Sequence, residues 1–284
     1  MKARWELLLI PPFIVTLVLT AASQFFLAKN SLYKDLGLGL VNDTLQLTNY
    51  IRYFTDTFYL KSLWVTIEIS VMAAFFTLLF SYPVAYVIAR MKSKWAMVML
   101  AAIISSSFIT IVIKVFGLII IFAADGWLNR FLMWSGLRDS PFTIVGSEAG
   151  VVVGLMHFSL GFGVLILYSV VQTIPKSLEE ASQVHGASRF RTFWRVVLPL
   201  SIPGVTIGGL MLFNLCMGAF TSASLLGGGF VFTLPVLIQR TVIMESKYSM
   251  GGTLAMVLLV VVVLINLLSL FLLRRMRVTK QVIS

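Results

Sequence analysis

Long apolar runs alternate with short polar segments along the whole chain, and this pattern predicts membrane-spanning helices. Several runs reach or exceed the roughly 20 residues that a helix needs to cross a bilayer. Lipid cannot satisfy free backbone groups, so each run is expected to be helical, and continuous apolar character argues against a membrane β-barrel. The six predicted spans are residues 7–28, 62–89, 96–123, 149–174, 203–226 and 252–273.

The start of the chain also resembles a cleavable signal peptide, because Lys2 and Arg4 precede an apolar run. That run is longer than the hydrophobic region of a typical signal peptide, which is about 7–15 residues. We therefore interpret it as the first span.

Two polar segments on the outer side are expected to have structure of their own. Residues 29–61 are too many for a tight turn and too polar for a span, so we expect a folded periplasmic loop. Further along, Trp127, Phe131 and Trp134 share one helical face, which is typical of a short helix lying in the membrane interface.

The most polar segment lies between the fourth and fifth spans, at residues 175–203. Pro175 is expected to end the fourth span, because proline disfavours helix in the residue before it. Ser177 and Glu180 have the spacing of a capping box, in which each side chain bonds the backbone amide of the other. The helix that follows is expected to end before Gly186, where a left-handed conformation costs little.

A second short helix is predicted to start near Ala187. An apolar stripe with helical spacing runs along it, and the arginines between point elsewhere. The stripe comprises Phe190, Phe193, Trp194 and Val197, and the arginines are Arg189, Arg191 and Arg195. Pro199 and Pro203 are expected to turn the chain back into the membrane. On these residues alone, the segment is either a connector resting on headgroups or a docking surface for a cytosolic partner.

The composition agrees with a membrane protein. Hydrophobic residues make up 59% of the chain and charged residues only 12%, whereas a soluble domain carries about a quarter charged residues. The one cysteine, Cys216, lies in an apolar run, and we interpret it as a small core residue.

The net charge of +11 follows the membrane topology and does not require nucleic acid as a partner. If the N-terminus lies inside, the inside segments carry more lysine and arginine than the outside segments, as cytoplasmic loops do. The inside set is Lys2, Arg4, Arg90, Lys92, Lys94, Lys176, Arg189, Arg191, Arg195, Arg274, Arg275, Arg277 and Lys280. We therefore expect both termini to be cytoplasmic and the basic residues to face membrane lipid.

The spacing within the polar segment resembles a known family. Glu180-Ala181-Ser182, three residues, Gly186, nine residues, Val196, one residue and Leu198-Pro199 are similar to the EAA loop of binding-protein-dependent ABC importer permeases. The family usually has alanine where this chain has Ser182, but both residues are small.

The resemblance covers roughly residues 62–273 and implies an all-α integral membrane fold. It is that of a six-transmembrane-helix ABC importer permease with a MetI-like core. Residues 1–61 would form a first helix and periplasmic loop, 62–273 the core, and 274–284 a cytoplasmic tail.

In that family the loop forms a coupling helix that sits in a cleft of the ATP-binding subunit. The resemblance implies that Glu180 contacts the ATPase and that Gly186 permits the turn. The implied coupling residues are Glu179, Glu180, Ala181, Ser182, Gly186, Ala187, Phe190, Leu198 and Pro199. The implied partners are an ATP-binding subunit dimer that binds ATP, a second and different permease subunit, and a periplasmic solute-binding protein, in a bacterial inner membrane.

Two further stretches, residues 80–90 and 218–239, resemble spermidine/putrescine-type permeases and related permeases for opines and other small organic solutes. Similar polyamine permeases carry an aspartate just before a Phe-Thr step, where this chain has Ala219. A dication would favour that carboxylate, so its absence weakens the polyamine interpretation. The expected solute is a polyamine or a related opine or amine-type compound.

Two charges lie within predicted spans, Glu68 and Lys114. Ionisable groups inside a membrane usually pair or line a pathway. We expect either that the two residues pair, or that Glu68 faces the translocation cavity and attracts cationic substrate. Asn214 is a further pathway candidate, although it and Asn266 are also typical of helix–helix contacts.

The residues favour a transport subunit over an enzyme. The sequence shows no paired catalytic constellation and no metal-ligand spacing. Its Gly227–Gly229 run lacks the Gly-Lys-Ser/Thr of a phosphate loop. A secondary transporter or channel is the main alternative, and it would require inverted repeats with interrupted helices in matched halves. A structural scaffold would show no energised transport. We expect no cofactor in this chain itself.

Overall fold

The computed structural model describes residues 9–37, 40–42 and 44–282, with side chains described as far as residue 271. The chain divides into two compact units, each of which is described by itself. Unit 1 comprises Met1–Leu63 and Leu234–Val261, and unit 2 comprises Trp64–Thr233 and Val262–Ser284. The basic residues predicted at the chain ends lie outside the described side chains, namely Lys2, Arg4, Arg274, Arg275, Arg277 and Lys280.

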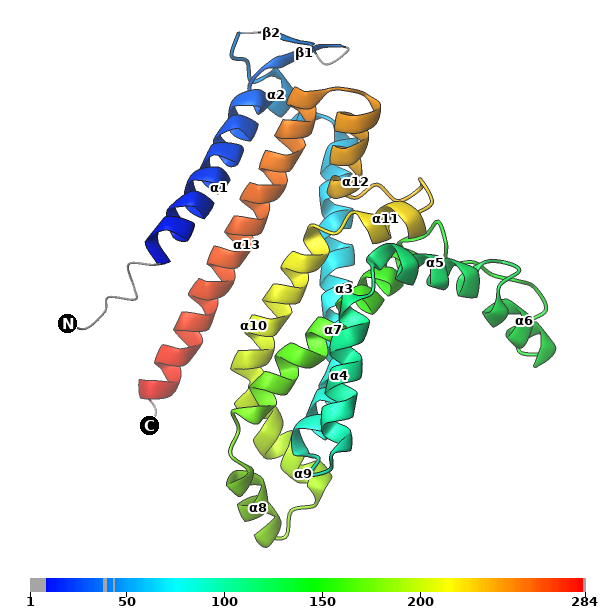
Figure 1. Cartoon of the computed structure of the whole chain (residues 1–284), viewed down its shortest axis with the longest axis vertical. Helices are drawn as coiled ribbons and strands as arrows, with labels where there is room; N and C mark the ends of the chain where they lie inside the picture. The colour runs from blue at the N-terminus through cyan, green and yellow to red at the C-terminus, as the bar shows by residue number, and fades with distance from the viewer. Residues whose placement is uncertain (1–8, 38–39, 43, 283–284) are drawn as a thin grey trace. The chain divides into compact units, whose positions relative to one another are not determined.

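Unit 1 contains long helices and a small hairpin (Figure 1). Its elements are α1 (Ile10–Ser31), β1 (Lys34–Gly37), β2 (Leu40–Asn42), α2 (Thr48–Thr55), the first residues of α3 (Thr57–Arg90), α12 (Leu234–Gln239), a π-helical turn (Arg240–Met244) and the first part of α13 (Tyr248–Val282). The strands are antiparallel. The described residues between positions 29 and 61 are therefore folded, as predicted.

Hydrogen bonds tie the hairpin of unit 1 to the start of α13. The Asp35 carboxylate accepts from the backbone amides of Ser249 and Met250, at 3.0 and 2.9 Å. These amides belong to the first turn of α13, where backbone donors have no partner within the helix and a negative charge is favourable.

Unit 2 carries the rest of α3 and the remaining helices. These are α4 (Trp95–Phe108), α5 (Ile111–Phe122), α6 (Trp127–Trp134), α7 (Glu148–Gln172), α8 (Lys176–Val184), α9 (Arg189–Thr192), a π-helical turn (Phe193–Val197), α10 (Leu198–Met217) and α11 (Thr221–Leu226). The short helix predicted around Trp127 is confirmed as α6.

Helix α3 is joined to two neighbours by buried hydroxyl pairs. Thr77 lies 2.7 Å from Ser159 of α7, and Tyr82 lies 2.6 Å from Ser201 of α10, oxygen to oxygen. Apolar packing surrounds these contacts, in a buried cluster of Tyr82, Ala85, Ile88, Val164 and Leu167. Since each hydroxyl has a buried partner, these polar groups fix the register of the helices without an unpaired donor.

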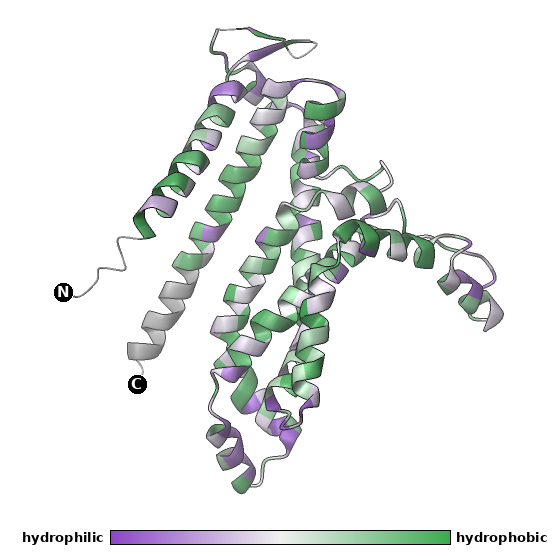
Figure 2. Ribbon diagram, in the orientation of Figure 1, coloured by the Kyte–Doolittle hydropathy of each residue, from purple (hydrophilic) through white to green (hydrophobic). Residues whose placement is uncertain are grey.

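Six helical segments of the described chain are long and apolar enough to cross a membrane, judged by length and composition. They are Ile10–Ser31, Thr57–Arg90, Ile111–Trp134, Glu148–Gln172, Arg189–Met217 and Tyr248–Phe271. Within unit 2, Figure 2 shows hydrophilic residues gathered on α8, whereas α4, α5 and α10 are mostly hydrophobic. The predicted number of spans and the all-α membrane fold are confirmed.

The prediction of one unbroken third span was wrong. The chain forms α4 and α5, separated at Ile109 and Thr110, whose ψ angles are 130° and 132°. Both residues are β-branched, which restricts their side chains in a helix and suits extended backbone. Hydropathy alone does not register this break, because the apolar character continues across it.

The prediction that prolines separate the loop from the fifth span was also wrong. Pro199 lies in the first turn of α10 and Pro203 lies inside it, so the helix continues from Arg189 to Met217. A π-helical turn precedes Pro199, with the Leu198 amide bonded to the Phe193 carbonyl. We attribute the continuity to this wider turn, because in a regular helix the Pro199 ring would clash with the carbonyl four residues earlier. The helix ends at Met217, before the predicted end of the span.

Candidate coupling site

Helix α8 begins earlier than the sequence predicts. Pro175 is the residue before it, and its side chain has no oxygen with which to cap the helix. Ser177 is therefore already the second helical residue, so the capping box predicted for Ser177 and Glu180 is wrong. Proline is compatible with this place because its fixed φ suits a helix start and its missing N–H is not needed there.

The turn after α8 agrees with the prediction for Gly186. Its φ is +82°, and no described heavy atom outside its chain neighbours lies within 4 Å of the position a Cβ would take. A side chain would have space there but would be strained by the left-handed backbone. The next helix, α9, starts at Arg189, slightly later than predicted, and the Ser188 hydroxyl accepts from the Arg191 amide at its N-terminus.

Ser182 has a specific partner in this chain. Its hydroxyl lies 3.2 Å from the hydroxyl of Thr192, a buried residue at the end of α9. This hydrogen bond joins the two helices on either side of the turn. The alanine that the family usually has at this position could not form it, so the departure from the pattern has a structural role here.

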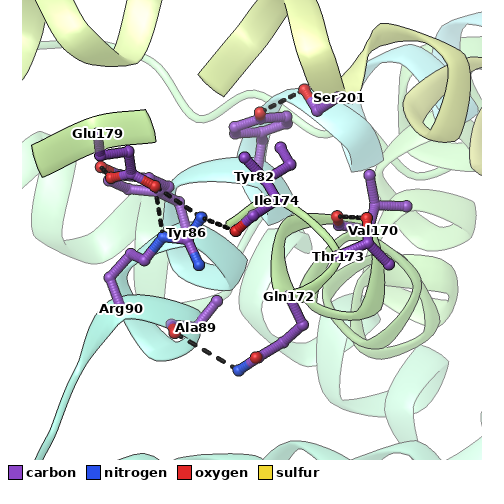
Figure 3. A network of polar contacts seen from close by, with 10 residues as sticks. All are labelled: Tyr82, Tyr86, Ala89, Arg90, Val170, Gln172, Thr173, Ile174, Glu179 and Ser201. Atoms are coloured by element: carbon purple, nitrogen blue, oxygen red, sulfur yellow. Dashed lines mark hydrogen bonds and ion pairs between the residues drawn. The ribbon is translucent and has the colours of Figure 1, made fainter. Parts of the chain in front are cut away.

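The two adjacent acids of α8 have opposite surroundings. Of the nine residues of α8, Glu179 is the buried one, with 7% of its surface exposed, and Glu180 is exposed. Figure 3 shows Glu179 directed toward Tyr86 and Arg90 of α3. We call Tyr86, Arg90 and Glu179 the clasp.

Two hydrogen bonds and an ion-pair contact converge on the Glu179 carboxylate. The Arg90 Nε and Nη2 both lie 2.6 Å from Oε1, and the Tyr86 hydroxyl donates to Oε2 at 3.0 Å. Arg90 Nη2 also donates to the Ile174 carbonyl at 3.0 Å. Charge-assisted bonds of this kind are stronger than neutral ones. Removal of one partner from a buried ion pair typically costs about 3–5 kcal/mol, because the other charge stays unpaired.

Aromatic contacts extend the clasp to the turn before α10. The Phe193 ring packs edge-on against Tyr86 and Tyr82, with centroid distances of 5.2 and 5.4 Å. Beside these rings lies a cavity of about 1280 Å³. Residues of α3, α8 and the α9 region line it, including Leu79, Gln183 and Trp194. Directed polar contacts, more than close packing, therefore hold α8 beside this cavity.

The other predicted coupling residues lie on the exposed side or at its margin. Glu180, Ala181, Phe190 and Pro199 are exposed, whereas Ala187 and Leu198 are half-buried. Phe190 is 74% exposed, and its ring contacts Trp194 at a centroid distance of 6.1 Å. The loop therefore presents both a carboxylate and an aromatic ring at its surface.

The three pathway candidates have different partners and exposure in the structure. Within the described side chains, no ion pair joins Glu68 to Lys114, and Glu68 is exposed while Lys114 is half-buried. Asn214 of α10 and Asn266 of α13 exchange hydrogen bonds of 2.9 and 3.0 Å. The two asparagines therefore join helices, and a pathway role for Glu68 or Lys114 stays a prediction.

The sequence did not single out Arg90 and Tyr86 as partners of the loop. The place of Arg90 at the end of a predicted span is typical of a membrane-flanking cation, and 88 residues separate it from Glu179 in the chain. Two features of the sequence could have indicated this contact: an arginine at the cytoplasmic end of one predicted span and a second acid beside Glu180. Only the fold brings these groups together.

Comparison with known proteins shows the family to which this chain belongs. Residues 81–278 match the family described as "Binding-protein-dependent transport system inner membrane component". The chain is 32% identical over 220 residues to the spermidine/putrescine transport system permease protein PotB of Haemophilus influenzae, and the match covers 75% of this chain and 77% of that protein. It is also 28% identical over 218 residues to a probable sulfate transport system permease protein of Prototheca wickerhamii, covering 74% and 83%.

Solved structures support the fold. A bacterial ABC transporter involved in the import of the acidic polysaccharide alginate has a chain with a TM-score of 0.79 and 19% identity, covering 96% of both chains. A second structure, of a bacterial alginate ABC transporter in complex with an alginate pentasaccharide-bound periplasmic protein, gives a TM-score of 0.74 and 18% identity, over 97% and 96%. The family match spans most of the chain, and this multi-pass membrane protein belongs to the inner membrane components of binding-protein-dependent transport systems.

Proposed function

We propose that this chain is the permease subunit of an ATP-driven importer and that its α8 loop is the surface on which an ATP-binding subunit docks. The observation that carries the proposal is the contrast between the two adjacent acids of the loop. Glu179 is buried and holds α8 to α3, while Glu180 and Gly186 are exposed and free to contact a partner. The family match supports the transport class.

In this proposal the partners supply what the chain lacks. An ATP-binding subunit dimer binds and hydrolyses ATP, a second and different permease completes the pathway, and a periplasmic protein delivers the solute. The loop and both termini are cytoplasmic. Closure of the ATPase dimer moves the loops of the two permeases, and the spans pass between two discrete arrangements.

Copurification tests the docking surface. The tagged chain is isolated from native membranes in mild detergent, and the ATP-binding subunit is quantified in the parent and in Gly186→Glu. We expect the ATPase to copurify with the parent and to be lost from the variant, because a charged side chain enters the exposed face of the turn.

Gly136→Glu is the matched control. Gly136 also has a positive φ, +71°, and open space around its Cβ position, but it follows α6. It should retain the ATPase. If the parent chain isolates alone in several detergents, the importer proposal fails and a secondary transporter or channel becomes the better account.

We further propose that the solute is a polyamine or a related opine or amine-type compound. The similarity to a spermidine/putrescine permease supports this class, while relatives named for sulfate and alginate transport set the competing class of anionic solutes. Ala219, between α10 and α11, supplies no carboxylate for a dication.

Uptake measurements separate the two solute classes. Vesicles holding the complete importer and its binding protein are tested with labelled putrescine, spermidine and an opine, with excess sulfate as competitor. We expect ATP-dependent uptake of at least one of the three compounds, without competition by sulfate. A parallel assay uses labelled sulfate. ATP-dependent uptake of sulfate, with no uptake of the three compounds, would contradict this assignment and leave the docking proposal unaffected.

A further inference from the structure

Helix α8 has four connections through which its movement can reach the spans. Two are backbone connections, through Thr173–Pro175 to α7 and through His185–Ser188 to α9, and neither is helical. The third is the single hydrogen bond between Ser182 and Thr192 of α9. The fourth is the clasp, which joins α8 to the end of α3 through side chains. A short non-helical connection transmits a displacement less faithfully than a rigid contact, because its backbone dihedrals can absorb it.

The clasp has the geometry of a rigid contact. Its carboxylate accepts hydrogen bonds on both oxygens from two α3 residues one helical turn apart and forms an ion pair with one of them, so Glu179 is fixed in direction as well as in distance. Arg90 also holds the Ile174 carbonyl, directly before Pro175. The same guanidinium therefore grips both sides of the bend between α7 and α8.

Helix α3 is in turn joined to the spans around it. Its Tyr82 and Thr77 form the buried hydroxyl pairs with α10 and α7, and the Ser81 hydroxyl donates to the Leu160 carbonyl of α7 at 3.2 Å. All three residues lie within four turns of Arg90 on the same helix. A displacement applied at Arg90 thus reaches α7 and α10 through α3.

Packing around the clasp is incomplete. Helix α8 contacts α9 and the π-helical turn, but a cavity of about 1280 Å³ lies beside the clasp, with Lys176, Glu180 and Gln183 among its lining residues. Without the clasp, α8 has space in which to shift relative to α3.

We propose that Tyr86, Arg90 and Glu179 are positioning residues that make α8 and the end of α3 move as one body during the transport cycle. The inference rests on the proposed function. It assigns the two adjacent acids separate roles: Glu180 faces the ATPase, and Glu179 transmits the movement of the loop into the spans.

The amount of solute transported per ATP hydrolysed, which we call the coupling ratio, tests this assignment. The complete importer, with its binding protein and ATP-binding subunits, is reconstituted in vesicles, and solute uptake and ATP hydrolysis are measured together. In Glu179→Gln we expect the ATPase subunit to remain bound while the solute transported per ATP falls by roughly tenfold or more, because the loss of one charge weakens the contact with Arg90. Tyr86→Phe should lower the ratio by a smaller factor, since it removes a single hydrogen bond.

Three further variants separate positioning from a merely structural role. Arg90→Glu combined with Glu179→Arg restores opposite charges at the same two positions, and its ratio should exceed that of either single variant. Glu180→Gln changes the neighbouring acid and should reduce binding of the ATPase subunit. Glu148→Gln is the matched control, since it makes the same change at an exposed acid in the first turn of α7. It should leave both the binding of the ATPase subunit and the ratio unchanged.

The failures are distinguishable. If no ATPase subunit assembles with the parent chain, the proposed function fails. If the complexes assemble and both Glu179→Gln and Tyr86→Phe keep the parent ratio, the clasp does not transmit movement. If Glu179→Gln loses the ATPase subunit as Glu180→Gln does, Glu179 is a docking residue and the inference is overturned. Should Glu179→Gln fail to accumulate, Tyr86→Phe and the charge exchange decide the question by the same ratio.

Discussion

Helices α7 and α8 follow one another in the chain but are held in opposite ways. Of the 25 residues of α7, 10 are buried, and glycines allow neighbours to approach it closely. Of the nine residues of α8, Glu179 alone is buried, and directed polar bonds hold it. Packing that is spread over many residues resists movement of a helix in every direction, whereas polar contacts to a single residue hold the helix at that residue. The comparison indicates that α7 is a rigid span and that α8, which follows it, can move relative to the spans when the clasp is broken.

The largest effect should come from overfilling the α7 side of this comparison. In Gly163→Leu, the new Cβ would lie 2.6 Å from the Ser81 oxygen and 2.8 Å from a Thr77 methyl carbon, both on buried residues of α3. We expect a loss of about 3 kcal/mol in the free energy of unfolding. The measurement is the midpoint of thermal unfolding in detergent.

Gly117→Leu is the control for that substitution. Gly117 lies within α5, and no described heavy atom outside its own helix backbone lies within 4 Å of its Cβ position. The same side chain should change the unfolding free energy by less than about 0.5 kcal/mol there. Equal destabilisation by both variants would contradict close packing of α7 as the cause, since leucine favours a helix more than glycine does at either position.

An intermediate effect should come from releasing α8. In Arg90→Met, Glu179 loses its cation but can reach water if α8 detaches locally. We therefore expect the free energy of local opening of the loop to fall by about 2 kcal/mol. Limited trypsin digestion at Lys176 and Arg189 should accelerate by roughly tenfold or more. The thermal midpoint should fall less than in Gly163→Leu. A midpoint that falls further than in Gly163→Leu would contradict the local character of the clasp.

The smallest effect should come from the turn between α8 and α9. Ser182→Ala removes the hydrogen bond to Thr192 and should cost about 1 kcal/mol locally. Hydrogen exchange of the backbone amides from Arg189 to Val197 should become faster, with the amides of α7 unchanged. Unchanged exchange throughout would mean that the Ser182 hydroxyl has no structural role.

Hydropathy and turn chemistry predicted much of this fold, because they depend on local sequence. The apolar runs gave the number of spans, and Gly186 was identified from the requirement for a left-handed helix end. Local reasoning failed where two local tendencies compete. Pro199 and Pro203 indicated a break that a π-helical turn accommodates, and the β-branched pair at Ile109 broke a helix within continuous apolar sequence.

The site was predictable on its exposed side only. The spacing of Glu180 and Gly186 is visible in the sequence, because both lie in one short segment. The partnership of Arg90 with Glu179 depends on how α3 packs against the loop, and a single sequence carries no record of that pairing. The capping box failed for a related reason: its spacing was correct, but Pro175 set the start of the helix.

Site-specific cross-linking tests the central claim most directly. The one cysteine, Cys216, is buried and can be replaced by serine, after which single cysteines are introduced by Glu180→Cys and, as a control on another exposed loop, by Arg138→Cys. The assembled importer is treated with a short thiol-to-amine cross-linker in the presence and absence of ATP. The account predicts a nucleotide-dependent cross-link to the ATP-binding subunit from Glu180→Cys and none from Arg138→Cys. A cross-link from Arg138→Cys alone, or from neither position in a complex that retains its ATPase, would contradict the assignment of the α8 loop as the docking surface.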